Sequence, residues 1–230
     1  MYNITFVCTI HKECGKCNSL ELHRIIESIS PEIIFEELSP SFFDKYYVTK
    51  IYKNLETDTI KKYIENCNIV HIPIGSRNIP SDSFANDVRY MYNRMESLTD
   101  INGYNYRIFD AKNSMYAGMY GFQYLNSIHC IDVQNKIDVA IEKCLQKIND
   151  EKLYQIYKLW KDSNNKRENE MLQNIYNYSK ENQYNQAIFF IGAGHRKSII
   201  EKIEKYKTQE NIKLNWIFYN NRSTESLKTD

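Results

Sequence analysis

The sequence predicts an α/β fold with a mostly parallel central sheet formed by the N- and C-terminal segments and a helical insertion in the middle. Two observations predict this class. Apolar runs at 3–7 and 33–38 flank a helical pattern, and a strand–helix–strand unit of this size implies parallel strands. Near the other end of the chain, the apolar segments 187–191 and 214–219 indicate two further strands.

The first third of the chain alternates between these strands and helices. The first helix is indicated by apolar residues at helical spacing, ending before Pro31: Leu20, Leu22, Ile25, Ile26 and Ile29. Residues 42–66 are predicted to be helical with a break near Glu56 and Thr57, and residues 69–72 are predicted to form the third strand. These elements extend the parallel sheet by one strand–helix–strand unit.

The middle of the chain is predicted to be mostly helical. One helix begins at Pro80–Asp82 and is expected to end at Asn102–Gly103, because this dipeptide favours a turn. The insertion at 104–182 has expected helix starts near Ser114, Asp132, Asp150 and Asn164. A final helix is predicted after Gly194.

Composition places the chain among folded proteins. Of its 230 residues, 42% are hydrophobic and 26% are charged, so we expect one α/β domain over 1–220, with a flexible tail at 221–230. The net charge of +1 gives no drive toward nucleic acid. No apolar run reaches the roughly 18 residues of a membrane span. The N-terminus lacks a signal-peptide pattern, so we expect a cytoplasmic protein.

Polar residues follow three of the predicted strands. In open parallel sheets, ligands bind beyond the carboxyl ends of the strands. His11 follows the first strand, Glu37 closes the second, and His195 follows the apolar strand 187–191. We therefore expect these three side chains to share one cleft. There they could hold a divalent metal with an open position, or activate water as base and acid without a metal.

Other residues could complete such a site. Gly192 and Gly194 would let the backbone turn close to a ligand, and the helix start after them, with Arg196, would favour an anion. Arg167 either is a charge on a helix surface or binds a substrate carboxylate or a developing oxyanion. Glu36 is expected to point away from Glu37, because successive strand side chains face opposite sides.

Two cysteines lie in the loop after His11. Cys14-Gly15-Lys16-Cys17 forms, with Cys8 and His11, a spacing suggestive of a soft-metal site. The position of Cys8 at a strand end and the short spacing make tetrahedral closure difficult, so thiols without a metal role are the favoured interpretation. A regulatory disulfide between Cys14 and Cys17 is a further alternative.

The remaining candidates have ordinary structural interpretations. His71 is expected to be a packed strand residue, and Asp132 a helix cap. A series of aromatic residues either packs between helices or lines an apolar pocket: Tyr116, Tyr120, Phe122 and Tyr124.

The order of these motifs resembles the TraB/Tiki superfamily, which includes TraB/PrgY and GumN proteins, erythromycin-esterase-like enzymes and ChaN-like proteins. The resemblance covers residues 3–38 and about 164–203. The family's first motif, Gly-x-x-His, is similar to Cys8–His11, where Cys replaces Gly. Its strand ending in Glu-Leu is similar to Ile33–Leu38. Its charged helix motif is similar to Lys166–Asn169, and its Gly-x-Gly-His motif to Gly192–His195. Glu37 matches the family's glutamate, and Glu36 is its outward neighbour.

The resemblance implies a hydrolase that acts on an amide (peptide) or ester bond. His11, Glu37, His195 and Arg167 would be catalytic, and the first three would be the ligands if Mn, Co or Zn is bound. Without a metal, a histidine oriented by Glu37 would take the proton from water. The alternative is a non-catalytic protein on the same scaffold that binds a small ligand or has a regulatory role.

Overall fold

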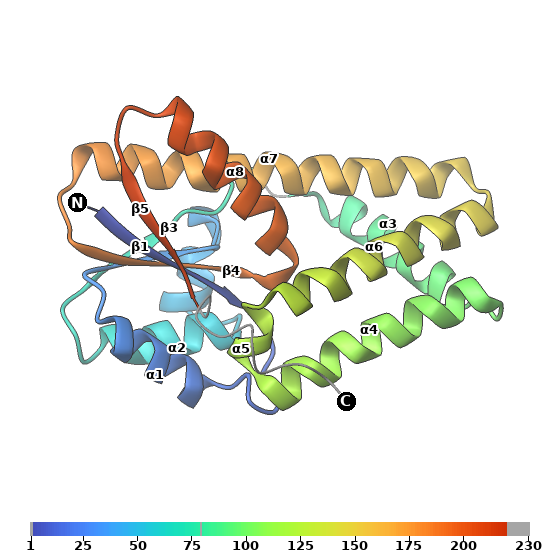
Figure 1. Cartoon of the computed structure of the whole chain (residues 1–230), viewed down its shortest axis with the longest axis horizontal. Coiled ribbons are helices and arrows are strands. Elements are labelled where there is room, and N and C mark those ends of the chain that lie inside the picture. The colour runs from blue at the N-terminus through green and yellow to red at the C-terminus, as the bar shows by residue number, and fades with distance from the viewer. Residues whose placement is uncertain (1, 79, 220–230) are drawn as a thin grey trace.

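The computed structural model describes residues 2–78 and 80–219 and confirms the predicted α/β class with a central parallel sheet (Figure 1). Five strands lie in the order β3-β2-β4-β1-β5, and the pairs between neighbours are parallel. The strands are β1 (Tyr2–Thr9), β2 (Ile33–Glu36), β3 (Val70–Pro73), β4 (Gln186–Gly192) and β5 (Leu214–Phe218). The predicted tail at 221–230 lies outside the described residues.

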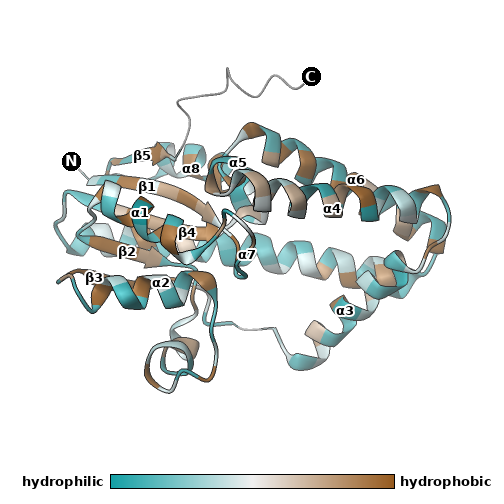
Figure 2. Ribbon diagram, turned by 90° about the horizontal axis from the view of Figure 1, so that it is seen from below, coloured by the Kyte–Doolittle hydropathy of each residue, from teal (hydrophilic) through white to brown (hydrophobic). Residues whose placement is uncertain are grey.

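Helices cover both faces of the sheet. α1 (Ser19–Ile29) and α2 (Leu55–Ile64) lie on one face, and α7 (Glu151–Glu181) and α8 (Arg196–Gln209) lie on the other (Figure 1). The central strands β1 and β4 are therefore buried on both sides, which explains their nearly continuous apolar runs. Figure 2 shows this concentration of hydrophobic residues on the central strands. Phe6 pairs with Phe189 across these strands, and both are fully buried.

The helices between β3 and β4 are α3 (Asp82–Glu96), α4 (Ile101–Tyr120), α5 (Phe122–Leu125), α6 (Ile128–Ile148) and α7. Of these, α3, α4 and α6 extend away from the sheet, and α7 runs from their far end back over the sheet (Figure 1). A second apolar cluster holds α3, α4, α6 and α7 together, separate from the cluster around the sheet. α7 contributes Leu153 to the cluster between the helices and Leu172 to the cluster around the sheet. No helix within 2–78 and 80–219 is long and apolar enough to cross a membrane.

Several predicted helix boundaries in this region are wrong. Asn102–Gly103 does not end a helix but begins α4, because the Asp100 side chain accepts hydrogen bonds from both of their N–H groups. A Cβ at Gly103 would lie 2.2 Å from the Leu98 carbonyl oxygen, so glycine permits the tight α3–α4 corner. The predicted starts at Ser114, Asp132 and Asn164 fall inside α4, α6 and α7.

The predicted cap Asp132 is replaced by Ser127, whose side chain accepts from the Cys130 N–H at the start of α6. The predicted start near Asp150 is confirmed, because this residue is the N-cap of α7.

The predicted helical segment 42–66 contains a longer interruption than expected. After two short turns, η1 (Pro40–Phe42) and the π-helical η2 (Asp44–Val48), the chain begins α2 at Leu55. Asn54 caps α2 by accepting from the Thr57 N–H, in a capping box. The expected break near Glu56 is thus the start of a helix. This boundary places Glu56 in the first turn of α2, next to the end of β1.

The carboxyl end of β1 is completed by a side chain. β5 pairs with β1 only as far as Phe6, so the backbone of Cys8 has no strand partner on that side among the residues that the structure describes. The buried Asn126 amide supplies one: its Oδ1 accepts from the Cys8 N–H at 2.8 Å and its Nδ2 donates to the Cys8 carbonyl at 3.0 Å. Asn126 thereby connects the α5–α6 corner to the strand that precedes His11.

Replacing Asn126 with alanine tests this connection. Two buried backbone groups of Cys8 lose their partner, so we expect the free energy of unfolding to fall by at least about 2 kcal/mol. Asn86→Ala, at an exposed position of α3, is the matched control and is expected to stay within about 0.5 kcal/mol of the parent. Urea unfolding of both variants provides the measurement. Equal effects would contradict the assigned role of Asn126.

Candidate functional site

A cavity of about 600 Å³ opens at the carboxyl edge of the sheet. β1 and β4 are neighbours, yet α1 and α8, which follow them, lie on opposite faces (Figure 1). This arrangement opens a crevice at the strand ends, where α/β proteins bind their ligands. The cavity is lined by His11 after β1, Glu37 after β2, Arg167 of α7 and parts of the 38–54 and 75–80 segments.

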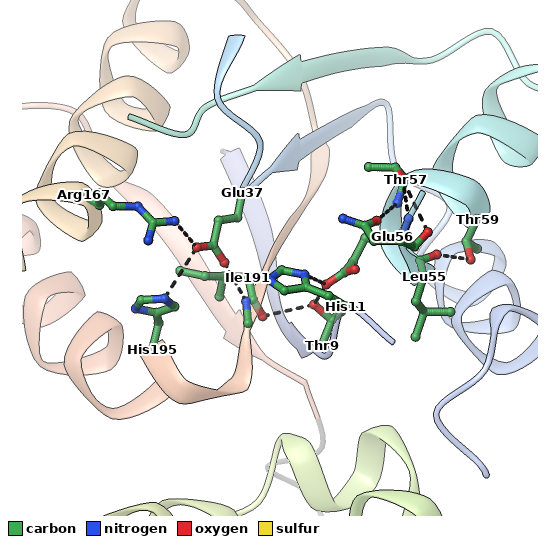
Figure 3. Close-up of polar contacts among 12 residues, drawn as sticks. Thr9, His11, Glu37, Leu55, Glu56, Thr57, Thr59, Arg167, Ile191 and His195 are labelled. Atoms are coloured by element: carbon green, nitrogen blue, oxygen red, sulfur yellow. Dashed lines mark hydrogen bonds and ion pairs between the residues drawn. The ribbon is translucent and has the colours of Figure 1, made fainter. Parts of the chain in front are cut away.

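His11 is held by a carboxylate that the sequence analysis did not select. Its Nδ1 lies 3.1 Å from Glu56 Oε1, which also accepts from the Thr9 hydroxyl at 2.6 Å (Figure 3). The Glu56 side chain is buried, whereas the His11 side chain is 65% exposed. The hydrogen bond to Glu56 is the main cause that raises the pKa of His11 to about 9, against the opposing effect of desolvation. The contact with Glu56 therefore favours the imidazolium form of His11 at neutral pH.

The Glu37 carboxylate contacts residues of α7, β4 and the turn after β4 at the cavity wall. Its Oε1 accepts from Arg167 Nη2 at 2.9 Å, and its Oε2 accepts from the Gly192 N–H at 2.8 Å (Figure 3). His195 Nε2 lies 3.5 Å from Glu37 Oε1. The Glu37 N–H still donates to the Phe190 carbonyl, so the pairing of β2 with β4 continues to the residue that carries this carboxylate.

His195 is oriented by a second carboxylate. Its Nδ1 lies 2.6 Å from Glu168 Oε1, and Glu168 Oε2 accepts from Lys202 Nζ at 2.7 Å and from the Ser198 hydroxyl. Burial by itself would raise the pKa of Glu168, but the hydrogen bonds from His195, Lys202 and Ser198 lower it below its usual value. The ionised Glu168 thus directs His195 Nε2 toward Glu37.

The structure brings most of the predicted catalytic residues together. His11, Glu37 and Arg167 line one cavity, while His195 contacts Glu37 from the other side and is not a lining residue (Figure 3). Glu37 orients neither histidine through a short hydrogen bond, contrary to expectation. Its oxygens already accept from Arg167 and Gly192, and Glu56 and Glu168 take the orienting role.

Two of the three residues predicted to bind an anion, Gly192 and Arg196, have other partners. The Gly192 N–H donates to Glu37, and neither Gly192 nor Gly194 has a positive φ. Arg196 is 3% exposed, donates to Asn126 Oδ1 at 3.3 Å, and places its guanidinium 5.7 Å from the centre of the Phe6 ring. Its side chain faces the interior rather than the cavity, so this geometry does not support an anion-binding role for Arg196.

The predicted metal ligands do not form a metal-binding group as they are arranged. Within the described ranges 2–78 and 80–219, no set of three His, Cys, Asp or Glu side chains is placed to hold a metal ion. Both oxygens of Glu37 accept hydrogen bonds, and one of them accepts from the cationic Arg167. In this arrangement the Arg167 guanidinium occupies the place beside Glu37 that Mn, Co or Zn would need.

A second, much smaller cavity adjoins the first and shares His11, Glu37 and Asn54 with it. Its volume of about 10 Å³ is close to the space that one water molecule requires. Glu56 also lines it, and Glu56 Oε2 is buried without a hydrogen-bond partner among the described residues.

Glu36 was predicted to face outward, but the structure places it in the interior. It is 3% exposed, and its Oε2 accepts from the Tyr47 hydroxyl and lies 2.8 Å from His71 Nε2. His71 is a packed residue of β3, as predicted. The side chains of Glu36 and Glu37 leave the chain on opposite sides. Through its hydrogen bond with Tyr47, Glu36 holds η2, the turn that follows the cavity-lining Phe42.

Sequence reasoning missed Glu56 and Glu168 as partners of the histidines. Glu168 follows Arg167 directly, within a segment already selected for its charge pattern. For Glu56, the Asn54–Thr57 capping box was the available signal, because it places Glu56 at a helix start.

Comparison of the chain with family models, with curated proteins and with solved structures found no match. The similarity to the TraB/Tiki superfamily accordingly stays a prediction from the motifs.

The His11–Glu56 pair predicts a measurable titration. Replacing Glu56 with glutamine removes the main cause of the raised pKa, so we expect the pKa of His11 to fall from about 9 toward the usual value of about 6.5. NMR titration of the histidine Cε1–H signals provides the measurement. Glu65→Gln, at an exposed position just beyond α2, is the matched control. A His11 pKa near 6.5 in the parent protein would contradict the pairing.

The Glu168 cluster predicts a large loss of stability. Glu168→Ala leaves the buried ammonium of Lys202 without its carboxylate, so we expect the free energy of unfolding to fall by about 3 kcal/mol or more. Adding Lys202→Met to this variant removes the uncompensated charge and should restore part of the loss. Denaturant unfolding checks both, with Glu181→Ala at the exposed end of α7 as control. A single-variant loss below about 1 kcal/mol contradicts the assignment.

Proposed function

We propose that this protein is a hydrolase that cleaves an amide or ester bond in the cavity at the carboxyl edge of the sheet, with the His11–Glu56 pair as acid and base. The observation that carries the proposal is this pair: His11 and the buried carboxylate of Glu56 are hydrogen-bonded, and both residues line a water-sized space that adjoins a cavity of about 600 Å³. The motif order similar to the TraB/Tiki superfamily supports the same reaction class.

The chemistry follows from the charges of the described side chains. Glu56 takes a proton from water, and the water oxygen attacks the carbonyl carbon of the substrate. His11 and Arg167 present positive charge to the developing oxyanion. As the C–N or C–O bond breaks, His11 Nε2 gives its proton to the leaving atom. Glu56 then releases its proton to solvent and His11 regains one, which restores the starting protonation states.

The cavity also indicates the kind of substrate. The charges of Arg167 and His11 are balanced by Glu37 and Glu56. The lining residues Lys12 and Lys53 are exposed and form no ion pair with a described residue, so they give the cavity an excess of positive charge. We expect a small molecule or peptide that carries a carboxylate or phosphate group. A cytoplasmic location belongs to this proposal as well.

A hydrolysis screen over esters and peptides tests the proposal, with each substrate offered in an anionic form and as its neutral amide or methyl ester. We expect His11→Ala and Glu56→Gln each to lower kcat/KM by about 100-fold or more, the usual contribution of a general acid or base. In the parent protein, kcat/KM should fall as the pH rises through about 9, where His11 loses its proton. Glu56→Gln shifts this limb to lower pH.

His23→Ala, a histidine of α1 outside the cavity, and Glu65→Gln are the matched controls and should keep parental rates. The screen is run with a chelator and with added Mn²⁺, Co²⁺ or Zn²⁺, so that a metal requirement is seen directly. Activity that survives both cavity variants would exclude this site. Binding of an anionic substrate without turnover would instead favour a non-catalytic ligand-binding protein on the same scaffold.

A further inference from the structure

The motif Cys14-Gly15-Lys16-Cys17 forms a tight hairpin in which the two cysteines face each other. The N–H of each donates to the carbonyl of the other, at 2.9 and 2.8 Å, as in an antiparallel bridge. Residues paired in this way have Cα atoms about 5.5 Å apart and side chains on the same face. Disulfides span Cα separations of roughly 4.4–6.8 Å, so residues paired in this way lie within the Cα range of a disulfide.

Both sulfur atoms are directed at one helix. Cys14 Sγ lies 3.8 Å from the Ser114 carbonyl oxygen, and Cys17 Sγ lies 3.3 Å from the Ala117 carbonyl oxygen, one turn further along α4. The two thiols therefore project from the same side of the hairpin. Cys14 is exposed to solvent, whereas Cys17 is fully buried.

Close backbone contact holds the hairpin in place. Gly15 has φ +52°, and a Cβ there would lie 2.3 Å from the Gly118 carbonyl oxygen of α4. The same oxygen accepts from the Lys16 N–H at 2.8 Å. A Cβ at Gly118 would meet Cys14 Sγ at 3.1 Å. Glycines at both contact points thus let the turn dock directly on α4 and keep the cysteines paired.

We propose that Cys14 and Cys17 are a redox modification site. Thiol–disulfide exchange with a small-molecule disulfide converts the two thiols into an intramolecular disulfide. The Cys14 thiolate attacks one sulfur of the small disulfide and forms a mixed disulfide, releasing one thiolate. The Cys17 thiolate then attacks Cys14 Sγ and releases the second. The two protein thiols are oxidised and lose their protons, the small disulfide is reduced, and the two released thiolates take up those protons.

The order of attack follows from exposure. Cys14 reacts first because solvent reaches it. Burial raises the pKa of Cys17 to about 12, so its thiolate is scarce at neutral pH and the second exchange is the slower one. The rate of ring closure therefore increases with pH. This inference does not depend on the proposed hydrolase function, because it concerns only the hairpin and α4.

The test uses the folded, full-length protein and oxidised glutathione. After incubation, free thiols are alkylated, and the intact mass and peptide map are recorded. We expect the loss of two of the six thiols, with a single Cys14–Cys17 linkage and no retained glutathione. Cys14→Ser, at the exposed position, abolishes the reaction. Cys67→Ser, outside the hairpin, leaves it unchanged and is the matched control.

Three results would overturn the proposal: glutathione that stays attached to Cys14, no reaction at Cys14, or a disulfide that includes another cysteine. Repeating the incubation at higher pH distinguishes slow formation of the Cys14–Cys17 disulfide from no formation. More of Cys17 is then a thiolate, so it must displace the glutathione from Cys14 faster if the two cysteines are paired.

Discussion

The carboxylate of Glu37 is the contact on which the arrangement of the site depends. It follows β2, and its two oxygens accept from the N–H of Gly192, the last residue of β4, and from Arg167 of α7. The residue after β2 is thereby joined to a strand end and a helix that both lie more than a hundred residues further along the chain. The cavity lies beside this junction, so the positions of its charged walls follow from hydrogen bonds that are partly shielded from water.

Each histidine of the site has its own carboxylate, and the two pairs differ in character. Glu56 holds His11 at the edge of the cavity, where the ring is exposed and its positively charged form is favoured at neutral pH. Glu168 holds His195 in a buried cluster with Lys202 and Ser198, on the far side of Glu37. His11 is thus placed to meet a ligand, and His195 to support the wall that contains Glu37. The two histidines that looked equivalent in the sequence have distinct positions.

Apolar periodicity was sufficient to predict the fold class, because strands buried between two helical layers carry long apolar runs that few other structures require. The meeting of His11 and Glu37 could also be predicted, since the carboxyl ends of parallel strands share one edge. The same rule placed His195 in this cleft, but His195 is not a lining residue of the cavity, and Arg167 belongs to a helix that the rule does not cover. The partners Glu56 and Glu168 could not be predicted with the same rules. Their roles depend on which helix turn faces which strand end, and this is set by packing rather than by local pattern.

Boundaries between consecutive helices were the weakest predictions for a related reason. Asp132 and Asn164 are typical capping residues, yet they lie inside α6 and α7, where continuous packing against neighbouring helices outweighs their local preference. At Arg196, too, packing outweighs a local preference. Its position at a helix start favours an anion, but Asn126 and the Phe6 ring hold its side chain in the interior.

A crystal structure with anomalous scattering data tests the central claim most directly. We expect the Arg167 guanidinium within hydrogen-bond distance of the Glu37 carboxylate, the Gly192 N–H on its other oxygen, and His11 on the same cavity paired with Glu56. Arg167 turned into solvent, or His11 and Glu37 in separate depressions of the surface, would contradict it. An anomalous peak bound by Glu37 and either histidine would show that a metal, rather than Arg167, holds this junction.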